Sequence, residues 1–224
     1  MKLPGLFACC AVAFLAGCPG GHSTVPATAP ATVPTGAPGF IPAIALPGMA
    51  KTYIHPGSQM AFPDKVAGFH RIEITKYAPD ESDVSAGYNS DDPTSLITAT
   101  VYVFPAPVIP NLPSETPPAA RARQFERALA AVKKEITDAH PGAKLISEAE
   151  FVLNQVGRSH KGKKVSYEMA FNDGARPVNS CSDMYLFLSG KWLIEYRISC
   201  PKTSAAAAQR AINEFLTALT WDEI

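Results

Sequence analysis

Five cysteines carry the most reactive side chains in the sequence: Cys9, Cys10, Cys18, Cys181 and Cys200. A cysteine can act as a nucleophile, bind a metal, form a disulfide or accept a lipid group, and its surroundings decide which of these it does. No Cys-x-x-Cys spacing occurs, and no histidine lies near Cys181 or Cys200. The spacing therefore gives no support to a metal site or a catalytic thiol at these two positions.

The first 17 residues have the layout of an export signal. Lys2 is followed by an apolar stretch that is too short to span a bilayer. At its end, Leu15-Ala16-Gly17-Cys18 resembles the lipobox of bacterial lipoprotein precursors. The resemblance implies cleavage before Cys18, helped by the small residues ahead of it, and transfer of a diacylglyceryl group to the Cys18 thiolate. The alternative is an ordinary secretory signal whose cleavage site contains a cysteine.

Lipidation at Cys18 would make a membrane the first partner of the protein. Each buried methylene contributes roughly 0.8 kcal/mol, and two acyl chains already give stable attachment. Pro19 follows Cys18, whereas an Asp at that position is the usual signal for retention in the inner membrane of enteric-type bacteria. The resemblance therefore implies the cell envelope, and there the periplasmic face of the outer membrane.

Residues 18–50 are expected to form the lipidated cysteine and its tether. The stretch from Pro19 to Ala50 contains no Lys, Arg, Asp or Glu and repeats Pro, Ala, Thr and Gly. Such a composition buries too little apolar surface to offset the entropy of ordering, and its prolines favour extended conformations. A single globular domain is predicted for residues 51–224, which is long enough to bury one core.

The pattern of this domain predicts an α+β fold, a mostly antiparallel sheet of about six strands packed with two helices. Apolar and β-branched residues mark the expected strands, which are residues 69–77, 96–104, 144–156, 163–172, 182–188 and 193–199. Residues 119–140 have the apolar periodicity of a helix, and a second helix follows Thr203 or Ser204. The polar segment between the first two strands is expected to be a loop with at most one short strand. The element order is therefore ββ-α-ββββ-α, with one helix on each face of the sheet or both on one face.

This order of elements resembles the α/β/α sandwich of the PsbP-like domains. The resemblance is one of topology, without a shared motif. It implies a binding or assembly role.

Cys181 and Cys200 are predicted to form a disulfide, because only these two cysteines remain in the domain after export to an oxidising compartment. A four-residue loop at 189–192 would place Tyr185 opposite Tyr196 and Cys181 opposite Cys200. Counted from that loop, the cysteines stand at a non-hydrogen-bonded pair, where side chains lie closer together.

A cluster of cations near residue 160 is the best candidate for contact with an anion or a partner. Its members are Arg158, His160, Lys161, Lys163 and Lys164. They are expected at a hairpin turn, where they could meet lipid head groups, phosphates or an acidic partner. The alternative is an ordinary solvated turn.

No catalytic residue, metal site or cofactor site is predicted. The string from Gly157 to Gly162 resembles Gly-x-Ser-x-Gly imperfectly and lies between two strands, where a nucleophile elbow needs a strand followed by a helix. The acidic residues 80–83 and 91–92 lack the spacing and central glycine of an EF-hand loop, and the histidines are scattered. Lys and Arg number 20, as do Asp and Glu, so the formal net charge is zero and nucleic-acid binding gains no support.

The sequence therefore predicts a membrane-anchored envelope lipoprotein whose domain is a non-catalytic binding or accessory module for an envelope protein or polymer. Two alternatives stay open. One is a hydrolase whose site residues meet only in the folded chain. The other is a carrier with a cavity for a small ligand.

Overall fold

Strands dominate the chain from residue 52 onward. The computed structural model describes residues 51–110, 112, 115–172 and 177–222, so the expected signal and tether lie outside the described residues. The strands are β1 (Thr52–Ile54), β2 (Ala61–Pro63), β3 (Lys65–Val66), β4 (Phe69–Lys76), β5 (Val84–Ser90), β6 (Thr98–Pro105), β7 (Lys144–Gln155), β8 (Arg158–Asn172), β9 (Pro177–Ser189) and β10 (Trp192–Pro201). The helices are α1 (Pro117–Ala139) and α2 (Ala205–Ala218), and the 3-10 turn η1 (Lys202–Ser204) precedes α2.

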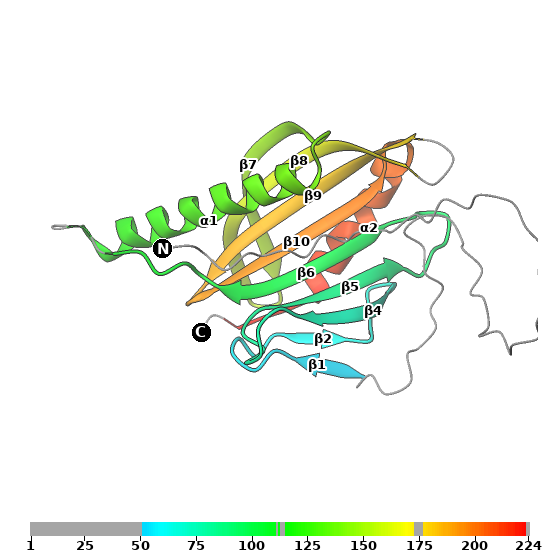
Figure 1. The fold of residues 1–224 in the computed structure, drawn as a ribbon. Coiled ribbons are helices and arrows are strands. Elements are labelled where there is room, and N and C mark those ends of the chain that lie inside the picture. Colours follow the sequence, from blue (N-terminus) through cyan, green and yellow to red (C-terminus); the bar gives the residue numbers. More distant parts are fainter. Residues whose placement is uncertain (1–50, 111, 113–114, 173–176, 223–224) are drawn as a thin grey trace, which may run out of the picture.

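The main sheet has eight antiparallel strands in the order β3-β4-β5-β6-β10-β9-β8-β7, and β1 pairs with β2 in a separate hairpin (Figure 1). The predicted α+β class is confirmed, and the main sheet has more strands than the six expected. The segment expected to be mostly loop contains β5, which is buried at every position. A strand covered on both faces lacks the alternation of apolar and polar residues that identifies a half-exposed strand.

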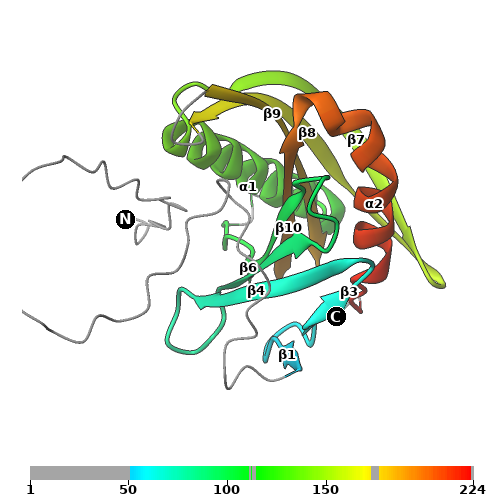
Figure 2. The same cartoon turned by 90° about the vertical axis from the view of Figure 1, so that its right-hand side faces the viewer.

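The two helices lie on opposite faces of the sheet (Figure 2). In β10, Leu193 packs in the cluster under α1, whereas Ile194 and Tyr196 pack in the cluster under α2. Successive side chains of a strand point to opposite faces, so one strand supplies both layers of core. The sandwich therefore has a helix, the sheet and a second helix as its three layers.

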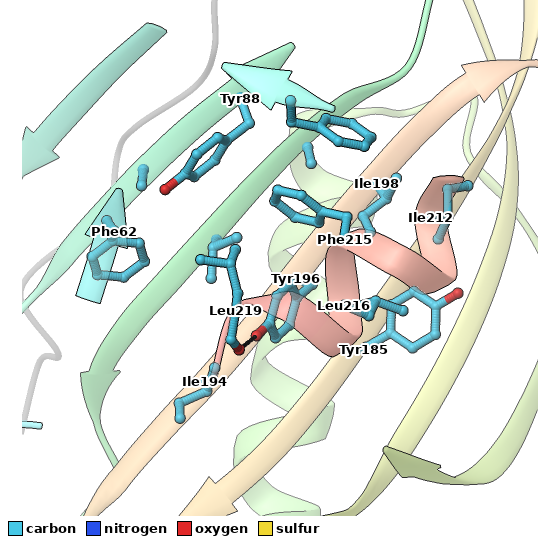
Figure 3. Close-up of a cluster of buried hydrophobic side chains, with 14 of the residues drawn as sticks. Phe62, Tyr88, Tyr185, Ile194, Tyr196, Ile198, Ile212, Phe215, Leu216 and Leu219 are labelled. Carbon is cyan, nitrogen blue, oxygen red and sulfur yellow. Dashed lines mark hydrogen bonds between the residues drawn. The ribbon is translucent and has the colours of Figure 1, made fainter. Parts of the chain in front are cut away.

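The core under α2 is rich in aromatic rings. Phe215 of α2 lies with its ring centroid 4.5 Å from that of Phe69 and 5.2 Å from that of Tyr88. The buried hydroxyl of Tyr196 donates a hydrogen bond of 3.1 Å to the carbonyl oxygen of Leu219, just after the helix (Figure 3). This bond satisfies a carbonyl that the end of a helix leaves without a partner.

The contact between α1 and the sheet includes a buried ionic group. Glu195 on β10 is 1% exposed and pairs with Arg197, which also pairs with Glu135 of α1 at 3.0 Å. The Arg197 guanidinium lies 4.6 Å from the ring centroid of Tyr102. Burial raises the pKa of Glu195, and Arg197 opposes that rise. The helix is thus tied to the sheet by charge as well as by apolar packing.

The β9–β10 hairpin has the predicted register, with Tyr185 opposite Tyr196 and Cys181 opposite Cys200. Its turn has two residues, 190–191, where four were expected. The closing pair of a two-residue hairpin is hydrogen-bonded and pair types alternate, so the cysteines stand at a hydrogen-bonded pair and not at the expected non-hydrogen-bonded one. The structure has both as free thiols, and the disulfide stays a prediction.

Among the described residues, no helix is both long and apolar enough to cross a membrane.

Candidate binding pocket

Strands β8 and β9 separate at Gly162. Their ladder runs from the pair of Asn172 and Pro177 to the pair of Gly162 and Phe187. Beyond that point β8 pairs only with β7, and β9 pairs only with β10. At Gly162 the strands approach so closely that a Cβ atom would lie 2.2 Å from the Leu186 carbonyl oxygen. The close approach and the separation that follows leave a gap in the sheet.

A pocket of about 320 Å³ occupies this gap. Its lining residues come from β8, from β9, from the first turns of α1 and from the segment after α2: Ser159, His160, Lys161, Phe187, Leu188, Ser189, Arg121 and Trp221. Small-molecule sites have volumes of roughly 300–1,000 Å³, so this pocket is at the lower end of that range. It can take a ligand considerably larger than a water molecule.

Arg121 forms one side of the pocket. Its Nη2 donates to the Leu188 carbonyl oxygen at 3.0 Å, and its Nη1 donates to the Gly190 carbonyl oxygen at 3.1 Å. Both acceptors are neutral carbonyl groups, so the charge of the guanidinium is not neutralised by these bonds. Lys161 is exposed on the facing strand, and the described residues supply no ion pair to it. The lining residues include no carboxylate.

Trp221 and His160 form the opposite wall. Their ring centroids are 4.3 Å apart with an angle of 31° between the planes, and both residues are buried. The Trp221 ring also lies 5.4 Å from Phe187 and 6.0 Å from Tyr196, centroid to centroid. The buried Nε1–H of Trp221 has no acceptor within the described part of the chain. The pocket thus combines an aromatic wall with two cationic side chains, Arg121 and Lys161.

The predicted cationic cluster is not at a hairpin tip. The turn between β7 and β8 is formed by Val156 and Gly157, and all five predicted residues lie within β8. Alternation along the strand sends them to two faces of the sheet, because neighbouring side chains point in opposite directions. The expected turn from Gly157 to Gly162 is therefore corrected to a two-residue turn followed by a strand.

Three of the five predicted cations have carboxylate partners inside the domain. Arg158 pairs with Asp222 and also donates to the Trp221 carbonyl oxygen at 3.1 Å. Lys163 lies 2.7 Å from Glu150, which raises the pKa of that lysine, and Lys164 lies 2.7 Å from Asp183. His160 and Lys161 are the two that reach the pocket.

Sequence reasoning missed Arg121 and Trp221. Arg121 and Leu188 are 67 residues apart in the chain, and no local pattern links a helical arginine to a distant strand end. Of the lining residues, only those on β8 had a signal in the sequence, because a run of basic residues follows an apolar stretch there.

The other groups considered for chemistry lie away from the pocket. His70 bonds through Nδ1 to Asp91 at 2.7 Å, where β4 begins and β5 ends. In the acidic segments, Asp80 accepts hydrogen bonds from Ser82, and Asp92 accepts hydrogen bonds from Thr94. These carboxylates therefore stabilise the turns in which they lie. Among the described residues, no group of three or more His, Cys, Asp or Glu is placed to hold a metal ion.

No family model matches the chain, and no curated protein matches it. Among the solved structures that match, two overlap with most of the chain. The solution structure of cyanobacterial PsbP (CyanoP) from Synechocystis sp. is 13% identical, with a TM-score of 0.43, and the overlap covers 79% of this chain and 95% of that one. The crystal structure of LpqN from Mycobacterium tuberculosis, described as involved in cell envelope biogenesis, is 14% identical, with a TM-score of 0.35 and coverage of 73% and 85%. At this level of similarity, neither structure indicates an activity for this chain.

Proposed function

We propose that the chain is an envelope lipoprotein, anchored through Cys18, whose domain binds another envelope component without catalysing a reaction. The pocket between β8 and β9 carries the proposal. It places Arg121 and Lys161 beside a gap whose lining residues contain no carboxylate. Such a site attracts and orients an anionic group.

The hydrolase alternative needs a serine, a histidine and a carboxylate within hydrogen-bond reach of one another. The pocket has Ser159, Ser189 and His160 among its lining residues, but no carboxylate is among them. At His70 the carboxylate is present as Asp91, and among the described residues no hydroxyl is hydrogen-bonded to this imidazole. Binding is therefore the function that the geometry favours.

Crosslinking in intact cells tests the proposal. Ser159 lines the pocket and is exposed, so a photo-reactive amino acid at this position would report what enters the gap. We expect a crosslinked envelope component whose yield saturates with expression and falls when Lys161→Gln and Arg121→Gln are combined. Arg210→Gln is the matched control, because this arginine is exposed on α2, away from the pocket. The absence of a saturable product would contradict the proposal, and turnover of a substrate by the purified protein would favour the hydrolase instead.

A small-ligand carrier is the second candidate, and the pocket volume of about 320 Å³ favours it. The site lies between two strands and not between sheet and helix, and its lining mixes cations with rings. Native mass spectrometry of the protein released from membranes distinguishes the two functions. A carrier would retain a bound small molecule, whereas an accessory module would be recovered with a macromolecular partner.

A further inference from the structure

Backbone donors face the gap between β8 and β9. In an antiparallel ladder, alternate residues direct their N–H and C=O groups to one neighbouring strand. The pair of Gln155 and Arg158 closes a two-residue turn and is hydrogen-bonded, so Ser159 and Lys161 direct their backbone groups away from β7 and toward β9. The next ladder partner of Lys161 would be Leu188, and that pair is not formed.

The bond from Arg121 to Leu188 supports this assignment. Counting from the β9–β10 turn, Leu188 directs its backbone groups away from β10 and toward β8. Its carbonyl oxygen accepts the Arg121 guanidinium at 3.0 Å, where a ladder bond would otherwise form. The N–H groups of Ser159 and Lys161 therefore point into the gap, whereas the Leu188 N–H is directed to the Lys161 carbonyl oxygen as part of the pairing at Gly162 and Phe187.

We propose that the pocket binds the oxyanion end of a small ligand, either a phosphate or a carboxylate. This inference rests on the proposed binding function and names the chemistry of its ligand. The backbone N–H groups of Ser159 and Lys161 supply fixed donors, and Arg121 and Lys161 supply charge. Fixed backbone donors with a neighbouring cation form the arrangement that holds anions in proteins.

The remaining lining residues determine which chemistry suits the rest of the ligand. Phe187, Trp221 and His160 form a wall of rings, which suits an apolar or ring-shaped body. The carbonyl group of Ser159 also points into the gap and can accept a hydrogen bond from a ligand hydroxyl. The pocket thus fits a small anion with a ring or apolar body, in which one end is an oxyanion.

The indole signals in a ¹⁵N nuclear magnetic resonance spectrum provide a direct test. The sequence has two tryptophans, so the full-length protein in detergent micelles should give two Nε1–H signals. Inorganic phosphate and acetate are titrated separately, with sodium chloride at matched ionic strength as the reference. We expect a saturable shift of the Trp221 signal with at least one oxyanion, and an unchanged Trp192 signal. The stronger of the two probes identifies the head group as phosphate or carboxylate.

Substitutions connect that shift to the pocket. Lys161→Gln and Arg121→Gln should each weaken the binding about tenfold, since each removes one charge-assisted contact. Arg210→Gln should leave it unchanged. Lys161 is exposed, so its substitution tests binding without endangering the core. A shift that never saturates, that chloride reproduces, or that neither pocket substitution weakens would overturn the inference.

The two proposals fail in different ways. If a saturable envelope partner is crosslinked at Ser159 but neither oxyanion moves the Trp221 signal, the ligand chemistry is wrong and the binding function stands. If the oxyanion binds but no envelope component is captured in cells, the ligand chemistry stands and the proposed function is wrong.

Discussion

Gly162 controls how closely β8 approaches β9 before the strands part. A Cβ atom there would lie 2.2 Å from the Leu186 carbonyl oxygen and 2.6 Å from Cδ1 of Phe187, so the backbone would have to move. Gly162→Ala should lower the free energy of unfolding by roughly 1–3 kcal/mol, as measured by urea denaturation. Gly142→Ala is the matched control, because its Cβ would meet nothing within 4 Å. Equal effects of the two substitutions would show that the strand approach is not constrained at Gly162.

Asp83 gives the domain a specific dependence on pH. Burial raises the pKa of Asp83 from 3.8 to about 6, and Glu135 adds to the rise. Its Oδ1 is buried and has no hydrogen-bond partner within the described residues. The folded state holds the carboxyl proton of Asp83 more tightly than the unfolded chain does. Ionisation of Asp83 therefore destabilises the fold as the pH rises from 3.8 through about 6.

Asp83→Asn should therefore be at least as stable as the unaltered protein at pH 7, and its relative advantage should shrink toward pH 4. Thermal unfolding at pH 4, 5.5 and 7 measures the difference between the two proteins. The difference in unfolding temperature between the two proteins isolates Asp83, because the other carboxyl groups titrate in the same range in both. A variant that is less stable than the unaltered protein at pH 7 would assign Asp83 a favourable ionic role.

The β9–β10 hairpin is the element on which the two cysteines depend. A hydrogen-bonded pair has Cα atoms about 5.5 Å apart, which is within the range that a disulfide spans. Burial raises the pKa of the Cys200 thiol to about 11, and the nearby Cys181 contributes. A thiol with such a pKa is a poor nucleophile, so a structural role fits it better than catalysis.

Protein exported to an oxidising compartment should have Cys181 and Cys200 joined. Alkylation under denaturing conditions without a reductant should leave both unmodified, and mass spectrometry would find them in one linked peptide pair. Reduction should lower the free energy of unfolding by roughly 3 kcal/mol, because the bridge closes a loop of about 20 residues. Full alkylation of both thiols in the exported protein would contradict the disulfide.

Elements with strong alternation were predictable from sequence, and those without it were not. β10 places apolar residues such as Ile194 and Ile198 on the α2 face, and its pairing with β9 followed from aromatic partners. β5 is buried on both faces and consists largely of small and polar residues, so its sequence resembles a loop. The start of β8 was missed because a basic segment after a glycine is typical of a turn.

The pocket shows where prediction from sequence ends. His160 and Lys161 were identified as candidates, but their setting in a strand, with His160 buried against Trp221, was not. Arg121 and Trp221 reach the gap only because α1 and the segment after α2 pack on opposite faces of the sheet. Contacts of this kind depend on three-dimensional packing, and a single sequence without its fold contains no local sign of them.

At the scale of the whole molecule, Cys18 should determine location without affecting the fold. Cys18→Ala is expected to give a soluble or unprocessed precursor with a folded domain, since residues between 53 and 221 build both core clusters of the described domain. Membrane fractionation and metabolic acyl labelling measure the first outcome, and circular dichroism with thermal unfolding measures the second. Normal membrane retention, with the acyl label on another residue, would refute anchoring at Cys18.

The place where the chain enters the described fold has a mechanical consequence. Residue 51 enters the described fold at β1, beside β2 and far across the sheet from β7 and β8 (Figure 1). Tension on a lipid-held tether would load the small hairpin first. That hairpin also touches the central part of the sheet, because the ring of His55, in its turn, lies 4.8 Å from the ring of Trp192 on β10. Trp192 pairs with Ser189 of the pocket. A pull on the membrane anchor therefore has a short route to the gap, through one ring contact and one strand pair.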